Sequence, residues 1–525
     1  MSQSEEVVAL TRAGWRRWHP RPLVALSCGI GISSGSALVL AHLEGSGGVG
    51  KFPGVPLEAP AAGSALEYSR SQGVRVLGHA DPGGGFNADV VAHRGFAYLA
   101  SWGTPSSDTH FCPSQGVRIY DLADPTEPAL AATFGSSASE PDLAGTWTEK
   151  VMVRSVKTPF FRGDLAVASL QACYAGDPSS VHPVAGFGVW DVTDPRRPRR
   201  LGLYETGTAG VHELWLEPRG KHAYVYAAVP LSEQLTGSAP DANDTATVPG
   251  TGDFRIIDVT DPRHPAQISS WGAWRELGVK PFPDGNLATN FAHSVIGSGD
   301  RAYVSYWDLG TLIFDVANPA APRLLGRTQD QPQQELHAHS SWLAQDTNLL
   351  IQTSEDFSPY ALGEPGIEDG WGYVRFFDIS DPARPRRVGA FEMPSTRPPP
   401  LPEDDAAPFV GQPPGYFSVH DAKVSDQTAF FSWYSEGVVA LDLRHPARPR
   451  QIAQFVPEPT ADPRGYFGDS DVAFPFVWGT FPYRGYVLAA DINSGLWVFE
   501  LSAPRAACRG EAPSPAGATD SVPAR

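Results

Sequence analysis

The sequence predicts an all-β fold: a seven-bladed β-propeller in which an N-terminal strand closes the last blade. Three observations lead to this prediction: a strand motif that recurs along the chain, a high content of turn-forming residues, and a strand-like segment ahead of the first repeat. The 525 residues include 53 Gly and 50 Pro. So many turn-forming residues indicate many short strands.

One strand motif occurs six times and defines the repeat. Each copy begins with β-branched or aromatic residues, reaches an aspartate, and stops at proline, which fixes a turn and cannot donate to a sheet. The copies are VRIYDLADPTEP, FGVWDVTDPRRP, FRIIDVTDPRHP, LIFDVANPAAP, VRFFDISDPARP and VVALDLRHPARP. A seventh, degenerate copy, LWVFELSAP, ends with Glu500 and Pro504. Seven copies predict seven blades.

Three more strands accompany each copy of the motif. A short strand such as PRRLGLYE follows it, and two strands precede it, for example HELWL and HAYVYAAV. Four strands per unit, repeating roughly every sixty residues, are typical of propeller blades with loop insertions.

The last copy lacks a fourth strand, because the chain continues as a tail rich in Pro, Ala and Ser. Residues 74–79 (VRVLGH) match the fourth-strand pattern, with Gly78 in register with Gly202, Gly326 and Gly389. We therefore expect this N-terminal strand to complete the last blade and leave no open sheet edge.

Residues 1–41 are predicted to be a signal peptide or a membrane anchor. Arginines up to position 21 precede an uncharged apolar stretch, and Val39 and Ala41 fit a small-residue cleavage pattern. The pair Arg16-Arg17 leaves a twin-arginine signal open. We therefore expect a secreted or cell-envelope protein. The remaining predicted boundaries are a linker at 42–72, the propeller at 73–502 and a disordered tail at 503–525.

Four consecutive repeats place a histidine at the same position of their first strand: His212, His293, His339 and His420. The first strand of each blade lines the axis of a propeller, so the four imidazoles are expected to converge there. The longest connections emerge on the same face, where binding and chemistry usually occur. In the other three blades the alignment places Asn87, Thr148 and a residue near Trp478 at this position.

The sequence leaves three interpretations of the histidines open. Three or four neutral imidazoles could bind a transition metal, namely copper, iron or zinc. The histidines could instead be repeat residues that cap backbone groups or bind water. Without a metal, His420-Asp421 or His212-Glu213 could carry out acid–base chemistry.

Five further residues are candidates to support the metal ligands. Adjacent residues of a strand point to opposite sides, so Glu213 and Asp421 are expected to act on ligands from other blades. Glu149 and Asp89 lie in the two first strands that lack a histidine and could do the same. His337, two residues before His339, could be a fourth or replacement ligand.

Other candidates carry less weight. Glu355-Asp356 at the loop rim could bind substrate or calcium, although a solvated loop end is the preferred interpretation. Aromatic residues that end second strands could stack on a ligand, but packing between blades is the simpler account; they are Tyr306, Trp307, Trp433 and Tyr434. Cys112 and Cys173 could pair in an exported protein, or they could be unrelated thiols.

The strand motif with its (D/N/H)-P-x-x-P ending resembles the LVIVD-repeat family. The resemblance covers nearly the whole chain after the leader and implies an exported or surface propeller, without implying one chemistry. In arrangement, though not in sequence, the histidine channel is similar to that of carotenoid-cleaving oxygenases. It is similar, more loosely, to that of selenium-binding or methanethiol-oxidising proteins. These hold a metal with histidines inside a seven-bladed propeller, which implies a redox metal here.

The leading prediction is therefore an exported propeller that binds a transition metal in a His-lined axial pocket and oxidises a small molecule. The alternative is a non-catalytic surface propeller that binds a protein or glycan through its long-loop rim. The formal net charge of −18 argues against nucleic acid as a partner. Membrane contact is expected only through an N-terminal anchor, and the chain is expected to be a monomer.

Overall fold

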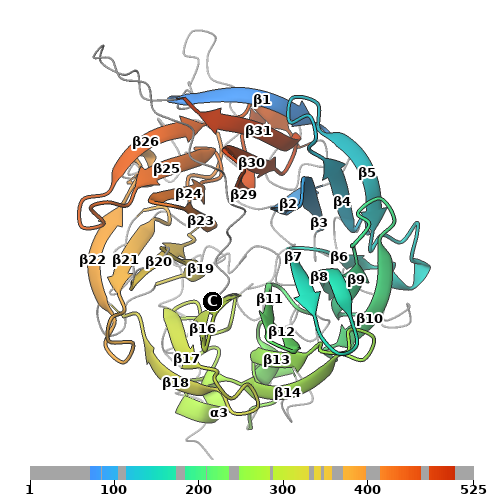
Figure 1. The fold of residues 1–525 in the computed structure, drawn as a ribbon. Coiled ribbons are helices and arrows are strands. Elements are labelled where there is room, and N and C mark those ends of the chain that lie inside the picture. The colour runs from blue at the N-terminus through green and yellow to red at the C-terminus, as the bar shows by residue number, and fades with distance from the viewer. Residues whose placement is uncertain are drawn as a thin grey trace, which may run out of the picture.

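Seven antiparallel four-stranded sheets are arranged around a central axis in the computed structural model (Figure 1). The structure describes residues 71–83, 86–103, 114–172, 184–207, 210–235, 248–283, 288–329, 336–344, 348–356, 370–397, 414–462 and 472–502. This arrangement confirms the predicted seven-bladed β-propeller.

Each blade runs from an inner to an outer strand, and the bounds of the first four blades are as follows. Blade 1 contains β2 (Phe86–His93), β3 (Phe96–Trp102), β4 (Val117–Asp121) and β5 (Ala129–Phe134). Blade 2 contains β7 (Val151–Lys157), β8 (Arg162–Ala172), β9 (Gly186–Asp191) and β10 (Arg199–Glu205), with the short β6 (Thr146–Trp147) beside β8. Blade 3 contains β11 (Leu214–Arg219), β12 (His222–Ala228), β13 (Phe254–Asp258) and β14 (Ala266–Trp271). Blade 4 contains β15 (Ser294–Ser298), β16 (Arg301–Ser305), β17 (Thr311–Asp315) and β18 (Arg323–Arg327).

The remaining three blades complete the ring. Blade 5 contains β19 (Ala338–Leu343), β20 (Leu349–Ser354), β21 (Val374–Asp378) and β22 (Arg386–Phe391). Blade 6 contains β23 (Ala422–Ser425), β24 (Thr428–Ser432), β25 (Val438–Asp442) and β26 (Arg450–Phe455). Blade 7 contains β29 (Val477–Tyr483), β30 (Tyr486–Asp491), β31 (Gly495–Leu501) and, from the start of the chain, β1 (Val74–Ala80).

The N-terminal strand closes the last blade, as predicted. Strand β1 pairs antiparallel with β31, from Val74 opposite Leu501 to Ala80 opposite Leu496. The Ser502 N–H also donates to the Gly73 carbonyl oxygen (2.8 Å). The inner strands of neighbouring blades contact one another around the whole ring. The two ends of the repeat array are therefore joined by sheet hydrogen bonds.

The aspartates of the repeat motif cap the turn between the third and fourth strands. In blade 1, Asp121 Oδ1 accepts a hydrogen bond from the Ala123 N–H (2.9 Å), and Asp124 Oδ1 accepts one from the Thr126 N–H (2.9 Å). Equivalent bonds recur in blades 2 to 6, at Asp191, Asp194, Asp258, Asp261, Asp315, Asn318, Asp378, Asp381 and Asp442. These side chains hold turns by hydrogen bonds to nearby backbone N–H groups.

In four of the seven blades, a glycine in the fourth strand lies against the turn of the next blade. A Cβ on Gly78 would lie 2.4 Å from the Pro125 carbonyl oxygen of blade 1. A Cβ on the glycines aligned with it would lie 2.5, 2.3 and 2.1 Å from the corresponding proline carbonyl oxygen; they are Gly202, Gly326 and Gly389. The predicted glycine register therefore reflects a contact between blades that occurs four times. The other three blades have Ala132, Ser269 and Ala453 at this register, and Ser269 Oγ donates to the Pro319 carbonyl oxygen (2.7 Å).

The core lies between neighbouring sheets. The third strands bury apolar residues at equivalent positions; these are Ile119, Val189, Ile256, Ile313, Phe376 and Ala440. Burial of this apolar surface on both faces of every blade is the main stabilising contribution of the fold.

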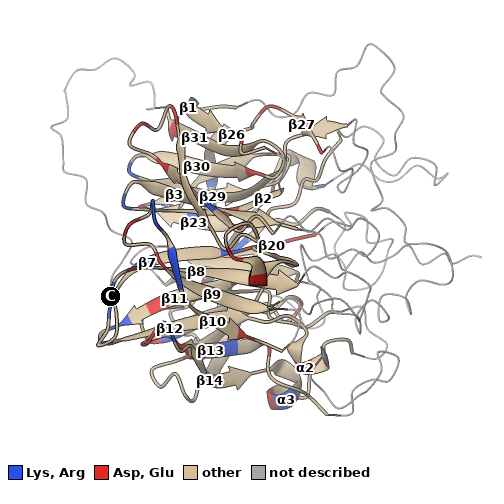
Figure 2. Cartoon of the chain, turned by 90° about the vertical axis from the view of Figure 1, so that its right-hand side faces the viewer, with Lys and Arg blue, Asp and Glu red and all other residues tan. Residues whose placement is uncertain are grey.

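Figure 2 shows the propeller from the side, with α2 (Ser232–Leu235), α3 (Ala273–Leu277) and β27 (Thr460–Ala461) on one face. Strand β27 pairs with β28 (Ala473–Phe474), and two 3-10 turns, η1 (Pro141–Leu143) and η2 (Pro394–Thr396), also belong to connections. Elements α3, β27 and β28 lie in connections that lead from one blade into the next, so the first strands begin at this face. Among the described residues, no helix is long and apolar enough to cross a membrane.

Replacing Gly78 by alanine is expected to destabilise the propeller. The added Cβ would lie 2.4 Å from one backbone oxygen and 2.7 Å from another, so backbone must move. Overpacking of this kind costs about 1–3 kcal/mol, measurable as a lower free energy of unfolding in urea. Val76→Ala is the control, because Val76 lies in the same strand but is 46% exposed. Equal stabilities of the two variants would contradict the proposed role of the glycine.

Candidate metal centre

The four predicted histidines lie at the start of the first strands of blades 3 to 6. The backbone N–H of His212 donates to Ala228 (3.0 Å), that of His293 to Ser305 (2.8 Å) and that of His420 to Ser432 (2.9 Å). Each acceptor is the last residue of the second strand in the same blade. His339 lies in β19 at a register shift between Ala338 and Ser340. All four side chains are buried.

The structure brings the four imidazoles together in one row. The ring centroids of His212 and His293 are 4.3 Å apart, those of His293 and His339 4.1 Å, and those of His339 and His420 4.2 Å. The repeat alignment therefore predicts correctly that these side chains are neighbours.

Three tryptophans continue the row into a closed ring. Trp478 lies 4.4 Å from His420, Trp102 lies 5.6 Å from Trp478, Trp147 lies 5.4 Å from Trp102, and His212 lies 6.4 Å from Trp147, all between ring centroids. Each of the seven blades thus contributes one aromatic ring.

Two of these rings are not the residues that the alignment places there. In blade 1, Asn87 donates through Nδ2 to the carbonyl oxygens of Asp491 (3.1 Å) and Ile492 (3.0 Å), and Trp102 at the end of β3 takes the place in the ring. In blade 2, Trp147 in β6 takes it in place of Thr148. An alignment of first strands alone does not include Trp102. The end of a second strand, where the sequence places several aromatic residues, is the signal for it.

Hydrogen bonds determine which ring nitrogen of two histidines carries the proton. His420 donates through Nδ1–H to the Trp478 carbonyl oxygen (2.6 Å), so its Nε2 has a free lone pair. His212 donates through Nδ1–H to Gln171 Oε1 (2.8 Å) and accepts at Nε2 from Nε2–H of His293 (3.0 Å). His293 consequently has its lone pair on Nδ1. His212 has partners on both nitrogens and positions His293.

Several buried ring nitrogens have no hydrogen-bond partner in the described part of the chain. They are Nδ1 of His293, both nitrogens of His339, and Nε2 of His420. Leaving buried polar atoms unpaired is costly. A metal ion would satisfy them, because a histidine ligand typically donates its other N–H to a carbonyl or carboxylate, as His420 does.

Glu355 lies beside two of these histidines. Its Oε2 is 3.6 Å from His339 Nε2, and its Oε1 accepts a hydrogen bond from the Tyr434 hydroxyl. One ligand atom each from His339, Glu355 and His420 lie within 4.8 Å of one another. Glu355 is 1% exposed, so the preferred sequence interpretation of a solvated loop end is wrong. The side chain points inward from the residue that follows β20.

A second group of possible ligands shares His339. One ligand atom each from Glu213, His293 and His339 also lie within 4.8 Å of one another. Glu213 thus approaches histidines of other blades, as the alternation of side chains along a strand predicts.

The buried residue Lys150 lies close to three of the predicted supporting carboxylates. The sequence did not identify this lysine as a candidate. Lys150 Nζ lies 3.2 Å from Asp89 Oδ2, 3.2 Å from Asp421 Oδ2 and 3.5 Å from Glu213 Oε2. Lys423 also pairs with Asp421. Four blades contribute to this network, so it connects the inner strands across the axis.

The other two predicted supports have different neighbours. Glu149 accepts a hydrogen bond from Trp478 Nε1–H and so supports the ring next to His420. His337 stands apart from the two groups of possible ligands: its ring is 5.2 Å from that of Trp307, and its nitrogens lie 3.8 Å from carboxylate oxygens of Asp308 and Asp356.

The aromatic residues at the ends of second strands are buried, as the packing interpretation requires. Tyr306 donates to Asp253, and Trp433 donates to the Phe417 carbonyl oxygen. Trp307 and Tyr434 also contact the histidine row, with ring centroids 5.3 Å from those of His293 and His420 respectively.

Burial keeps the four histidines neutral. It lowers the pKa of His212 and of His420 to about 3, and it lowers the pKa of His293 and of His339 well below the usual range. Neighbouring imidazoles add to this effect for three of them, and Lys150 adds to it for His212, His339 and His420. At neutral pH these rings therefore offer lone pairs without first losing a proton.

The carboxylates and Lys150 respond to burial in opposite directions. Burial raises the pKa of Glu149, Glu213 and Asp89, although Lys150 partly offsets the effect. Burial alone would lower the pKa of Lys150, but its carboxylate partners outweigh this and raise the pKa well above the usual value. Lys150 therefore remains charged. The two lysines also outweigh burial at Asp421 and lower its pKa.

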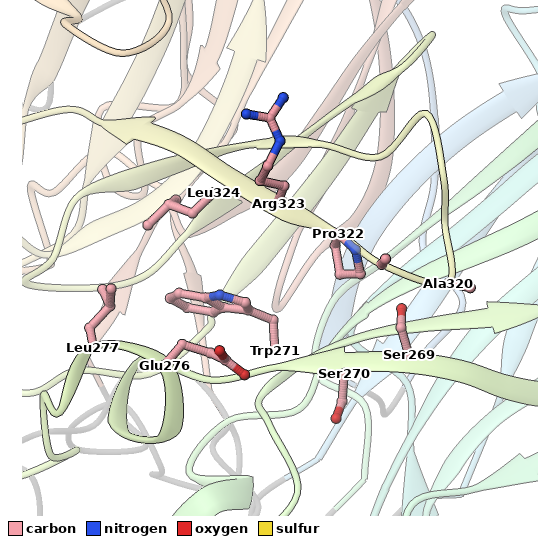
Figure 3. A pocket seen from close by; sticks show the side chains of 10 residues that line it. Ser269, Ser270, Trp271, Glu276, Leu277, Ala320, Pro322, Arg323 and Leu324 are labelled. Atoms are coloured by element: carbon pink, nitrogen blue, oxygen red, sulfur yellow. The ribbon is translucent and has the colours of Figure 1, made fainter.

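A surface groove lies elsewhere on the molecule, at the outer edge between β14 and β18 (Figure 3). Its lining includes the apolar residues Trp271, Leu277 and Leu324 and the charged residues Glu276 and Arg323. None of the predicted site residues lines it, so it is separate from the histidine cluster.

Several sequence predictions lie outside the described residues: the leader and most of the linker, the tail, Cys112, Cys173, and parts of the long loops, including most of the Pro-rich stretch at 397–415. The leader, the disulfide and the loop-rim binding surface therefore stay predictions, as do the domain boundaries.

Comparison with known proteins supports the repeat assignment. A family model described as the LVIVD repeat matches residues 291–330, which span blade 4 and include His293. The chain is similar to a solved structure of the computationally designed Ika8 protein, with 8% identity, 81% of this chain and 99% of that chain covered, and a TM-score of 0.41. It is also similar to the β-propeller domain of Myceliophteria thermophila Cps50 (Swd1), with 13% identity, 81% and 98% covered, and a TM-score of 0.43. No curated protein matches the sequence.

The free energy of unfolding of the metal-free protein is expected to fall as the pH drops from about 6.5 toward 3. The pKa of His212 is 6.5 when unfolded and about 3 when folded, so unfolding takes up a proton in this window. Each such histidine lowers the free energy of unfolding by about 1.4 kcal/mol per pH unit. His212→Gln should make the dependence shallower by one proton. Equal slopes for the unaltered protein and His212→Gln would disprove the assignment.

Proposed function

We propose that this LVIVD-repeat β-propeller binds a transition metal ion, namely copper, iron or zinc, in its central channel. With copper or iron bound, it would oxidise a small molecule, and dioxygen at an open coordination position would accept the electrons. One observation carries the proposal: His339, Glu355 and His420 are buried, and one ligand atom from each lies within 4.8 Å of the others.

The chemistry of these three residues suits a metal. Two imidazoles and one carboxylate form the donor set of many zinc and non-haem iron sites, and copper also binds imidazole. Three protein ligands leave coordination positions open for a small molecule. A bound metal would supply Lewis-acid or redox chemistry at this point of the channel.

Residues of this chain would hold the ligands in place. The Trp478 carbonyl fixes the tautomer of His420 so that Nε2 faces the site. The Tyr434 hydroxyl binds one oxygen of Glu355, while the other oxygen faces His339. Such partners orient ligands and strengthen metal binding. The Lys150 network ties together the inner strands that carry these side chains.

We also propose that the protein is secreted or associated with the cell envelope and that its partner is a small molecule. Both points rest on the sequence alone.

The purified full chain, after reconstitution, is expected to retain a transition metal through buffer exchange. His420→Ala and Glu355→Gln should each weaken binding by about tenfold or more, because each removes a ligand or its charge. Elemental analysis and metal competition titrations measure this. The matched control is His445→Ala, because His445 is exposed in the same blade as His420. A protein that retains no metal above background under any loading condition refutes the proposal.

Azide is expected to bind to the metal-loaded protein. Cobalt or copper in the site should change its visible absorption on azide addition, because three protein ligands leave a position open. An unchanged spectrum would indicate a closed structural metal site and rule out chemistry at the metal.

A further inference from the structure

We propose that the channel holds two metal ions at adjacent positions that share His339. This inference rests on the proposed function, and it specifies how many ions the same cluster takes and which residues hold each one.

Two sets of possible ligands overlap at a single residue. Set A consists of Glu213, His293 and His339, and set B consists of His339, Glu355 and His420. Each set has one carboxylate and two imidazoles, so each by itself has the composition of a metal site. Set A draws on blades 3, 4 and 5, whereas set B draws on blades 5 and 6.

The spacing in both sets suits coordination. Three ligand atoms about 2.0–2.2 Å from one metal lie about 3.3–3.8 Å from one another. The atoms of each set lie within 4.8 Å of one another. Shifts of about 1 Å or less therefore bring them to coordination distance, and neither set requires a rearrangement of the strands.

His339 is the residue through which the two sets join. Its Nε2 lies 3.6 Å from Glu355 Oε2 in set B, and neither ring nitrogen has a hydrogen bond to a side chain among the described residues. A neutral imidazole has one lone pair, because its other nitrogen carries a proton. To hold both ions, His339 would therefore bind as an imidazolate: its ring N–H proton would pass to solvent as the second ion binds, and each nitrogen would then hold one ion.

Besides His339, each set contains a second histidine with a lone pair that is available to a metal. His293 is protonated on Nε2 through its bond to His212, which leaves Nδ1 for set A. His420 is protonated on Nδ1 through its bond to Trp478, which leaves Nε2 for set B. One hydrogen-bonded histidine thus belongs to each set.

The channel is lined by more carboxyl groups than cationic groups in the described part of the chain. Five buried carboxyl groups lie around the histidines and Lys150, namely Asp89, Glu149, Glu213, Glu355 and Asp421. Lys150 lies close to three of them, and Lys423 also pairs with Asp421. Carboxylate oxygens are ligands of divalent metal ions, so this lining suits the binding of cations.

The test is the stoichiometry of the full chain with zinc. The metal-free protein is titrated with Zn²⁺, and bound zinc is measured after buffer exchange. The expected result is two equivalents for the unaltered protein and one each for Glu213→Gln and Glu355→Gln. His339→Ala should lose both. Glu205→Gln, an exposed carboxylate on β10, is the matched control and should keep two.

The outcomes separate this inference from the proposed function. No bound zinc, copper or iron would refute both. One equivalent in the unaltered protein, reduced by both glutamate variants, would leave the proposed function standing and overturn the two-ion arrangement. Because this result comes from the unaltered chain, a variant that fails to fold does not affect it. Copper-loaded protein gives a second measurement: two neighbouring Cu²⁺ ions should couple and lose electron paramagnetic resonance intensity relative to total copper, whereas full intensity contradicts the arrangement.

Discussion

The rest of the structure depends on the contact between the fourth strand of one blade and the proline turn of the next, which four of the seven blades make through a glycine. Gly78 and its counterparts have no side chain, so a strand backbone can approach a turn carbonyl where a Cβ would overlap it. The contact of Gly78 with Pro125 belongs to the closing strand, so the last blade meets the first in the same way as blades 2, 4 and 5 meet their neighbours. The inner strands of neighbouring blades also contact one another, which places the starts of successive first strands side by side. The histidine rings are consequently 4.1–4.3 Å apart between centroids, although up to 81 residues separate neighbours in the chain.

The channel carries polar groups that the blade-to-blade packing does not require. Neutral imidazoles, unpaired ring nitrogens and an excess of carboxylates are all costly to bury. Apolar side chains at these positions would stabilise the ring more, as they do between the sheets. Lys150 offsets part of the cost by pairing with three carboxylates from other blades, but it does not reach the nitrogens of His339. Functional sites typically contain groups that destabilise the fold locally, and the packing of the rest of the structure compensates for them.

Repetition explains how much of this structure the sequence predicts. Strands, turns and the closing strand follow from aligned motifs, because each residue of a repeat meets the same neighbours in every blade. The convergence of the histidines follows for the same reason. Glu355, Trp102 and Lys150 do not follow from it. Trp102 ends a second strand, Glu355 comes directly after one, and Lys150 reaches across the axis to three other blades. Their contacts depend on side-chain direction and on distances across the ring, which an alignment of repeats does not contain.

The four histidines occupy equivalent positions in the repeat, but their ring nitrogens have different hydrogen-bond partners. His212 meets Gln171, His420 meets the Trp478 carbonyl, and both ring nitrogens of His339 lack such a partner in the described chain. These differences arise from residues outside the aligned position, so each imidazole presents a different nitrogen to the channel. Blades that supply no histidine therefore also influence the histidine cluster, through the hydrogen-bond partners that they provide. Blade 2 supplies Gln171 and blade 7 supplies the Trp478 carbonyl, and these two partners determine which lone pairs face the two groups of possible ligands.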